Sequence, residues 1–276
     1  MSFTKMQALG NDFMVIDLIS QKISLSKSTI INLSNRNLGV GFDQLLLVEK
    51  SQSNHIDFYY RIFNANGEEV SQCGNGARCF ALFVHLKQLS NKKKISIATQ
   101  KSHMICEVID FQNVLVDMGQ PDFIPKNIPF LTDKINIYYS LLIKKTIFYF
   151  GVVSFGNPHC VIIVDNINDP KINIFGPLIE KHHLFPENVN VGFVQIITPG
   201  HIKLRVYERG VGETKSCGSG ACAAVAVGIN QNLLSSHVQV DLIGGSLKII
   251  WKGVGSKLYM TGSANYVYDG TIFITS

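Results

Sequence analysis

The 276-residue sequence is poor in charged residues, which make up 16% of it, and its net charge is only +5. The basic residues are dispersed, and their one run, Lys92-Lys93-Lys94, indicates a solvated turn rather than a patch that binds nucleic acid. Hydrophobic residues make up 46% of the sequence. This composition is typical of a globular chain with a large core, long enough for one large domain or two of ordinary size.

Long apolar runs are also missing. No stretch of about 18 apolar residues could span a membrane, and no N-terminal segment has the apolar centre of a signal peptide. We therefore expect a cytoplasmic protein that binds neither membrane nor nucleic acid, and in that compartment cysteines are reduced thiols. Their spacing lacks the C-x2-C pairs of zinc sites, so we expect no metal. The six are Cys73, Cys79, Cys106, Cys160, Cys217 and Cys222.

Two similar stretches stand out in what remains. Cys73-Gly74-Asn75-Gly76-Ala77 is matched by Cys217-Gly218-Ser219-Gly220-Ala221, and each opens a segment that turns strongly apolar. Glycine lets the backbone approach a ligand closely. The first turn of a helix has unpaired N–H groups and a partial positive charge, which can hold an anion and stabilise a thiolate. The pattern predicts two anion sites, each with a tunable thiol.

Other blocks repeat at the same spacing and in the same order. Arg61-Ile62-Phe63-Asn64 corresponds to Arg205-Val206-Tyr207-Glu208, and Glu69 corresponds to Glu213. We interpret these matches as an internal duplication. It predicts an α+β protein with two pseudo-symmetric domains, residues 1–117 plus 263–276 and residues 118–262, and a cleft between them.

Each domain should consist of short strands around one apolar helix. Residues 56–63 alternate, with Ile56, Phe58, Tyr60 and Ile62 on one face, as in a half-buried strand. The apolar runs 77–89 and 221–229 predict helices that are buried on every side. We also expect a turn at residues 10–12 and a helix over residues 29–37 with Ser28 as its cap.

Cys73 and Cys217 are the strongest candidates for chemistry. Free cysteine is often a packing residue, and we assign Cys79, Cys106, Cys160 and Cys222 to that role. Cys73 and Cys217 fit it poorly, because glycine and polar residues surround both. A symmetry-related pair of thiols suggests an acid and a base on opposite faces of one carbon, which is what inverting a stereocentre requires.

At this point the sequence resembles a known family. The motifs Asn11-Asp12-Phe13, Phe63-Asn64-Ala65, Cys73 to Cys79, Gly156 to Cys160, Glu208-Arg209-Gly210 and Gly212 to Gly220 together resemble diaminopimelate epimerase. The resemblance implies an enzyme without cofactor that interconverts LL- and meso-diaminopimelate, on the route to lysine and peptidoglycan. It also implies two domains, each a barrel-like sheet wrapped around a central helix, an active site in the cleft, and a homodimer.

The resemblance also implies roles for individual residues. Cys73 and Cys217 would be the catalytic thiols, and His159 and Glu208 would tune them. The remaining substrate contacts would be Asn11, Gln44, Asn64, Gly74, Asn75, Asn157, Asn190, Glu208, Arg209, Gly218 and Ser219. The chain departs from the family at Gln7-Ala8, where histidine and glycine are expected, and at Phe155 and Lys215.

Three other interpretations remain open. A racemase of the same fold could act on another amino acid such as proline, although Arg209 and the asparagines favour a longer, doubly charged substrate. A two-domain protein could bind a small acid without reacting with it, and it would then tolerate serine at Cys73 and Cys217. A redox or zinc protein is the third.

Overall fold

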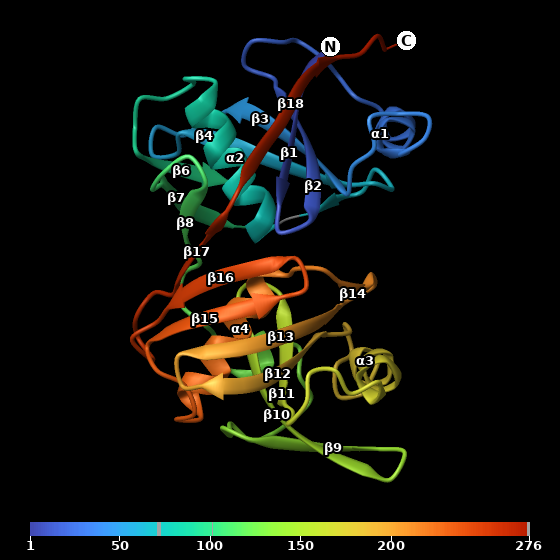
Figure 1. Cartoon of the computed structure of the whole chain (residues 1–276), viewed down its shortest axis with the longest axis vertical. Coiled ribbons are helices and arrows are strands. Elements are labelled where there is room, and N and C mark those ends of the chain that lie inside the picture. Colours follow the sequence, from blue (N-terminus) through green and yellow to red (C-terminus); the bar gives the residue numbers. More distant parts are fainter. Residues whose placement is uncertain (71–72, 101, 275–276) are drawn as a thin grey trace. The chain divides into compact units, whose positions relative to one another are not determined.

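The computed structural model describes residues 1–70, 73–100 and 102–274. It separates into two compact units, Met1–Asp117 with Thr261–Ser276 (unit 1) and Met118–Met260 (unit 2). The described residues form a mixed α/β protein, mostly strands with four α-helices (Figure 1). None of the helices in this part of the chain is both long and apolar enough to cross a membrane.

Unit 1 is built on a set of paired strands. In order of pairing they are β18 (Asn265–Thr271), β1 (Ser2–Ala8), β2 (Asn11–Asp17), β3 (Gln44–Lys50), β4 (Phe58–Asn64), β6 (Lys94–Ala98), β7 (His103–Val108) and β8 (Asn113–Asp117). The short β5 (Glu69–Val70) pairs with β4. β17 (Tyr259–Ser263) leads into β18, so the end of the chain returns to pair with its beginning.

Unit 2 has the same kind of arrangement. Its strands pair in the order β9 (Tyr139–Ile143), β10 (Thr146–Ser154), β11 (Pro158–Ile163), β12 (Asn190–Thr198), β13 (His201–Glu208), β15 (His237–Leu242) and β16 (Gly245–Ile250). The short β14 (Gly212–Thr214) pairs with β13, as β5 pairs with β4. A short 3₁₀ helix, Pro125–Asn127, precedes these strands.

The directions of pairing repeat between the units, as the internal duplication predicts. From β1 to β7 the successive pairs are antiparallel, parallel, antiparallel, parallel and antiparallel, and from β10 to β16 they follow the same sequence. Parallel neighbours need a crossover connection. The four crossovers carry α1 (Lys27–Ser34), α2 (Gly74–Leu86), α3 (Lys171–Glu180) and α4 (Gly218–Asn230).

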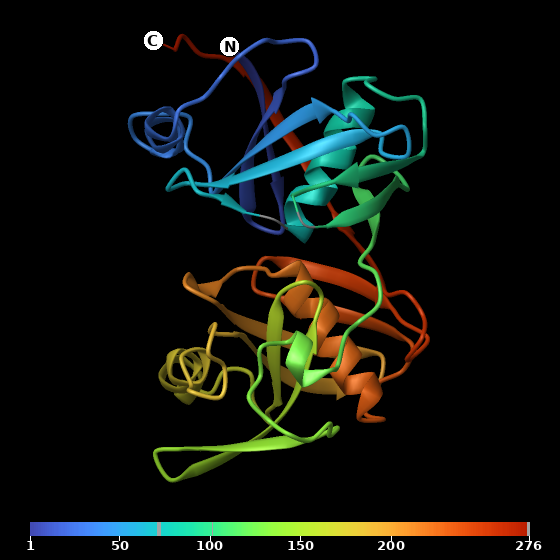
Figure 2. The same cartoon turned by 180° about the vertical axis from the view of Figure 1, so that it is seen from behind.

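One helix in each unit is enclosed by strands. α2 contacts β1, β2, β3, β7, β8 and β18, whereas α4 contacts β10, β11, β12, β13 and β16. Both are buried through eleven consecutive residues, Gly74–Val84 and Gly218–Gly228. Figures 1 and 2 show these two helices among the strands of their own unit, with α1 and α3 to one side of theirs. The predicted buried helices are therefore confirmed in place, although each begins three residues earlier than expected. α2 ends at Leu86 rather than at residue 89, and residues 85–88 are exposed.

Two local predictions were wrong. The helix expected over residues 29–37 is present, but α1 spans Lys27–Ser34. It begins earlier because Ser26 rather than Ser28 accepts the Thr29 N–H and caps it. The first turn lies at Leu9-Gly10, where both residues have positive φ (53° and 78°), as in the tight turns that match the twist of a hairpin. Residues 11 and 12 already belong to β2.

Candidate active site

Cys73 stands directly before α2. Its extended backbone (φ −152°) ends the preceding segment, and its Sγ accepts the Gly76 N–H at 3.2 Å, so the thiol caps the helix. Gly74 and Asn75 follow in the first turn and are buried, while Cys73 itself is half-buried. The sequence prediction that this cysteine begins a buried helix is therefore confirmed.

The Asn75 side chain has a structural partner that the sequence analysis left unassigned. Its Oδ1 accepts from Arg78 Nη2 at 2.9 Å, and Arg78 Nε donates to the Ser263 carbonyl at 3.1 Å. The Arg78 side chain is fully buried. A buried arginine needs such partners, and the bonds join the start of α2 to the end of β17. Arg78 therefore holds the backbone of the first helical turn in place.

Gln44 and Asn64 lie opposite each other on β3 and β4. Gln44 Nε2 donates to Asn64 Oδ1 at 2.9 Å, so the structure brings together two residues that the resemblance assigned to substrate binding. Gln44 Oε1 is buried and accepts no hydrogen bond from any residue in the described ranges. A buried acceptor normally has a donor. This carbonyl oxygen is therefore suited to an N–H group of a ligand.

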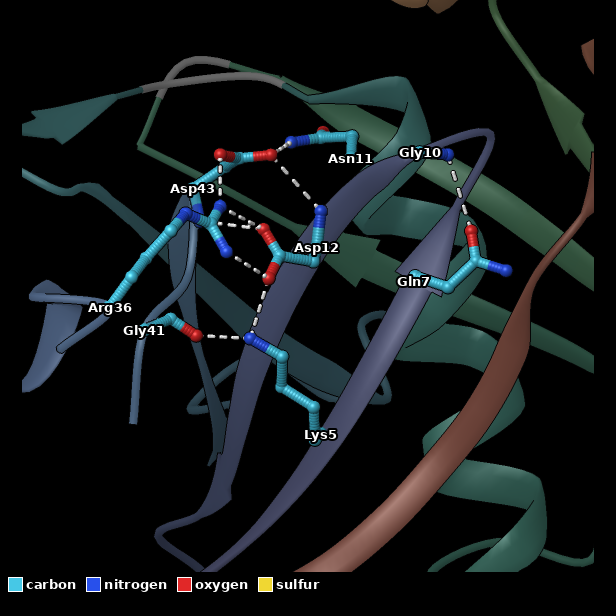
Figure 3. A network of polar contacts seen from close by, with 8 residues as sticks. All are labelled: Lys5, Gln7, Gly10, Asn11, Asp12, Arg36, Gly41 and Asp43. Atoms are coloured by element: carbon cyan, nitrogen blue, oxygen red, sulfur yellow. Dashed lines mark hydrogen bonds and ion pairs between the residues drawn. The ribbon is translucent and has the colours of Figure 1, made fainter. Parts of the chain in front are cut away.

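Asn11 is held by a network of charged residues (Figure 3). Asp43 Oδ2 accepts a hydrogen bond from Asn11 Nδ2 at 2.9 Å. The side-chain oxygen of Asn11 is then the atom of this amide that can accept a hydrogen bond. Arg36 contacts both Asp12 and Asp43, and Lys5 donates to Asp12 at 2.6 Å and to the Gly41 carbonyl. The hydrogen bonds from Arg36 and Lys5 hold the pKa of Asp12 well below its usual value, against the opposing effect of burial.

The departure Gln7-Ala8 lies beside this network. Gln7 Oε1 accepts the Gly10 N–H at 3.2 Å across the Leu9-Gly10 turn (Figure 3). Ala8 is fully buried. Glutamine at this position therefore supports the turn that precedes Asn11.

In unit 2, Cys217 is the residue before α4, and it is 5% exposed. Its Sγ lies 3.6 Å from Ser219 Oγ, and the thiol hydrogen-bonds the Glu208 carboxyl. Burial, and then the Glu208 charge, raise the pKa of Cys217 well above its ordinary value, although Ser219 and the Gly220 amide oppose this. Cys217 is therefore a protonated thiol in the ligand-free protein.

Glu208 closes this cluster at the end of β13. Its Oε1 accepts from Thr214 Oγ1 at 2.5 Å. Burial raises the pKa of Glu208, while hydrogen bonds from Thr214 and Cys217 work in the opposite direction. The Glu208 carboxyl and the Cys217 thiol are thus two acidic groups that lie close together and are largely removed from solvent. Their proximity disfavours the ionisation of both at once.

His159 connects to the same thiol through two side chains. Its Nε2 lies 3.1 Å from Asn157 Oδ1, and Asn157 Nδ2 donates to Ser219 Oγ at 3.2 Å. Because Asn157 presents an oxygen, His159 Nε2 carries the proton. Burial, followed by the positive charge of Arg209, lowers the pKa of His159 to about 3. His159 is therefore neutral at physiological pH.

Asn190 and Arg209 complete the group. Asn190 is the neighbour of His159 on β12, donates to the Pro158 carbonyl at 2.9 Å and accepts the Arg209 N–H at 3.1 Å. The Arg209 side chain is exposed, and its Nη1 donates to the Glu187 carbonyl at 3.2 Å. A guanidinium has five N–H donors, so this side chain can still bind a carboxylate.

Four residues that contact the predicted site residues were not predicted from the sequence: Asp43, Tyr60, Arg78 and Thr214. Tyr60 lies beneath the first turn of α2, and the contacts of the other three are described above. The position of Asp43 beside Gln44 could have indicated it, whereas the strand and helix patterns around Tyr60 and Arg78 indicated only their secondary structure. The four cysteines assigned to packing are fully buried, and burial raises the pKa of Cys106 to about 12.

Comparison with known proteins agrees with this arrangement. The sequence matches the family described as diaminopimelate epimerase over residues 3–124 and 151–267, which include both cysteine motifs. A hydroxyproline epimerase from Agrobacterium vitis with bound trans-4-hydroxy-L-proline is 12% identical, with a TM-score of 0.70 over 98% of this chain and 91% of that one. A probable proline racemase from Agrobacterium radiobacter is 11% identical, with a TM-score of 0.69 over 99% and 93%.

A phenazine biosynthesis protein of the PhzF family from Bacillus anthracis is 15% identical, with a TM-score of 0.66 over 99% of both chains. At such low identity these likenesses establish a common fold and not a common substrate. The family assignment rests on the sequence match, which spans most of the chain and both halves of the duplication. This chain is thus a member of the diaminopimelate epimerase family.

Proposed function

We propose that this protein interconverts LL- and meso-diaminopimelate, with Cys73 and Cys217 as the two proton-transfer groups at one α-carbon. The observation that carries the proposal is the family match across both cysteine motifs. Each of these cysteines precedes a buried helix in its own copy of the duplication. The enzyme would need no cofactor and would serve lysine and peptidoglycan synthesis.

The helix starts suit the charge that this reaction develops. Removing an α-proton places negative charge beside the substrate carboxylate. The first turns at Gly74-Asn75 and Gly218-Ser219 present backbone N–H groups, and each helix end has roughly half a positive charge. Donors fixed in advance at a developing charge are usually the largest contribution to catalysis.

The two thiols have unequal surroundings, as a two-base mechanism requires. Cys217 is held protonated by burial and by Glu208, so it suits the acid. Cys73 is half-buried and accepts the Gly76 N–H, and such a bond at a helix start stabilises a thiolate. In the reverse direction the roles exchange.

Polar groups at the strand ends suit an amino diacid. The unpartnered Gln44 Oε1 can accept from an ammonium group, and the exposed Arg209 guanidinium can hold a distal carboxylate by two parallel bonds. The Arg209 guanidinium favours a longer amino acid with a second carboxylate over proline.

A direct assay tests the proposal. Purified protein incubated with LL-diaminopimelate should give the meso isomer, resolved by chiral chromatography, and should approach the same mixture when started from meso-diaminopimelate. No interconversion from either side would contradict the proposed substrate.

A second candidate is the epimerisation of another small amino acid. It is favoured by the fold shared with a hydroxyproline epimerase and a probable proline racemase. The same assay with L-proline and trans-4-hydroxy-L-proline separates the two candidates, because their products differ from meso-diaminopimelate. The family resemblance also supports a homodimer, which light scattering coupled to size-exclusion chromatography would detect.

A further inference from the structure

Tyr60 lies beneath the first turn of α2 and is 1% exposed. Its ring packs on Phe80 of that helix, with centroids 4.7 Å apart. Its hydroxyl occupies the space that Gly76 leaves, since a Cβ on Gly76 would lie 2.1 Å from the Tyr60 oxygen. The same Cβ would lie 3.4 Å from Cys73 Sγ. The hydroxyl and the thiol therefore both border the space beside Gly76.

The Tyr60 hydroxyl has no hydrogen-bond partner within residues 1–70, 73–100 and 102–274. A buried hydroxyl without a partner is unusual in a folded protein. The titratable and charged groups near it are Cys73, Cys79, Arg78 and, from β7, Cys106. Arg78 is bonded to Asn75 and Ser263, and Cys79 and Cys106 are fully buried thiols. Cys73 is the half-buried one among these thiols.

The second copy of the duplication has no such hydroxyl. The residue corresponding to Tyr60 is Leu204. A Cβ on Gly220 would meet a Val206 methyl at 3.0 Å and the Cys217 side chain itself at 3.3 Å. The polar groups at Cys217 are instead the Ser219 hydroxyl, 3.6 Å from Sγ, and the Glu208 carboxyl, which favours the protonated thiol. The fold thus gives the two cysteines different polar neighbours.

We propose that Tyr60 is a positioning residue for Cys73, whose hydroxyl donates to Sγ when Cys73 is a thiolate. When Cys73 ionises, its proton passes to solvent, and the phenol group, which makes no hydrogen bond to Sγ in the structure, shifts to donate to the sulfur without losing its own proton. When Cys73 takes up an α-proton from substrate, this bond is released. Burial raises the pKa of Tyr60 well above its ordinary value, which keeps the hydroxyl a donor. The proposal deepens the proposed function and rests on it only for the role of Cys73 in catalysis.

The test measures the thiol without substrate. Tyr60→Phe removes one oxygen, and the alkylation rate of Cys73 by iodoacetamide is followed from pH 5 to pH 10 by peptide mass spectrometry. A hydrogen bond to a charged group is worth roughly a factor of ten or more. We expect Cys73 alkylation at pH 7 to be about tenfold slower in the variant, with its pH profile moved to higher pH. An unchanged Cys73 profile would overturn the proposal.

Two controls make the result specific. Tyr59→Phe makes the same change on the neighbouring residue of β4, whose side chain points to the other face, and it should leave the Cys73 profile as in the wild type. Cys217 in the same Tyr60→Phe samples should keep its wild-type profile. An equal shift in Tyr59→Phe, or at Cys217, would indicate a general loosening of the protein and would also overturn the proposal.

A second pair of variants tests the placement of the hydroxyl. Gly76→Ala introduces a methyl group against the Tyr60 oxygen and should lower Tm. Adding Tyr60→Phe should restore part of that loss, because the clashing atom is gone. Strictly additive effects would contradict the contact. Neither experiment uses an amino acid substrate, so a protein without epimerase activity that shows both effects would retain the Tyr60 proposal and lose the proposed function.

Discussion

At the scale of single residues, Cys217 and Glu208 show how burial decides protonation. Desolvation is the largest cause of the raised pKa of each, and their proximity adds to it for the thiol. A neighbouring carboxylate disfavours the thiolate, so it keeps Cys217 protonated before the proton passes to substrate and favours its return afterwards. The pair therefore matches the acid in a proton-transfer reaction better than the base.

Glu208→Gln tests this pair through stability. The pKa of Glu208 is raised in the folded state, so its contribution to stability is full below the ordinary glutamate pKa and is lost as the pH rises through the folded value. Glutamine does not ionise, so the variant does not lose stability in this way as the pH rises. We expect the Tm of Glu208→Gln minus that of the wild type to become more positive from pH 4 to pH 8, in thermal unfolding followed by circular dichroism.

Glu187→Gln is the control, because the Glu187 side chain is exposed. Its Tm difference from the wild type should change little over the same range. A flat difference for Glu208→Gln as well would show that the folded protein does not raise the pKa of this carboxyl.

At the scale of elements, the network around Asp12 joins β1, β2, the segment after α1 and the residue before β3. Asp12 contacts Lys5 and Arg36, and Arg36 continues to Asp43, which holds Asn11 (Figure 3). Exposed ion pairs contribute little to stability. Here the Lys5 and Asp12 side chains are only 11% and 19% exposed, so this part of the network should contribute more.

Asp12→Asn tests the network. The variant keeps the shape and loses the charge, so Lys5 is left without its carboxylate. We expect the free energy of unfolding in urea at pH 7 to fall by about 1–3 kcal/mol, the range for hydrogen bonds to charged groups. The pKa of Asp12 is lowered in the folded state, so this contribution is present above the ordinary aspartate pKa and is lost as the pH falls.

The difference between Asp12→Asn and the wild type should therefore shrink at low pH. Asp133→Asn removes a carboxylate from an exposed position and should change stability by less than about 0.5 kcal/mol. Equal effects of the two substitutions would mean that the network does not stabilise unit 1.

At the scale of the whole molecule, the proposed reaction uses one thiol from each copy of the duplication. Two distinct bases leave an isotopic signature. In deuterated water, product formed early should carry deuterium at the inverted carbon, while recovered substrate keeps its proton. Deuterium appearing in recovered substrate as fast as in product would indicate one shared base.

Replacing each cysteine in turn tests the two thiols separately. Cys73→Ala and Cys217→Ala should each lower turnover by about 10²–10⁴, the usual contribution of a proton-transfer group. Cys222→Ala is the matched control within α4. Its side chain is fully buried, so the variant should lose some stability and keep its rate. A rate near the wild-type value in either of the first two variants would contradict the two-thiol mechanism.

The sequence by itself determined the features that depend on near neighbours. A cysteine and two glycines before an apolar run predict a buried helix, and both α2 and α4 have this form. The alternation from Ile56 to Ile62 predicts one buried face of a strand; Phe58, Tyr60 and Ile62 are buried in β4, whereas Ile56 precedes the strand and is half-buried. The repeated order of motifs predicts the repeated order of strand pairing. Alternation and helix starts are written within short stretches of chain, and the duplication is visible because such stretches recur in the same order.

The local sequence did not predict the bounds of α1 or the presence of α3. A competing capping residue set the first, and packing against distant residues set the second. Ser26 caps α1 although Ser28 is equally suitable by type, because its hydroxyl is the one that reaches the Thr29 N–H. α3 was not predicted, and it contains Pro177, which usually indicates a helix end. Its apolar residues Ile172 and Ile179 pack into the core of unit 2, so tertiary burial outweighs the local preference.

Only the tertiary structure decided the surroundings of the thiols. Arg78 accompanies Asn75 because a carbonyl 185 residues away, that of Ser263, accepts its other bond. Tyr60 lies against Gly76 because its ring packs on Phe80 of α2. The place of Glu208 beside Cys217 agrees with the tuning role that the family resemblance implied. The protonation of these groups follows mainly from desolvation. Desolvation depends on every residue packed around a group, and so it cannot be read from the residues beside it in the chain.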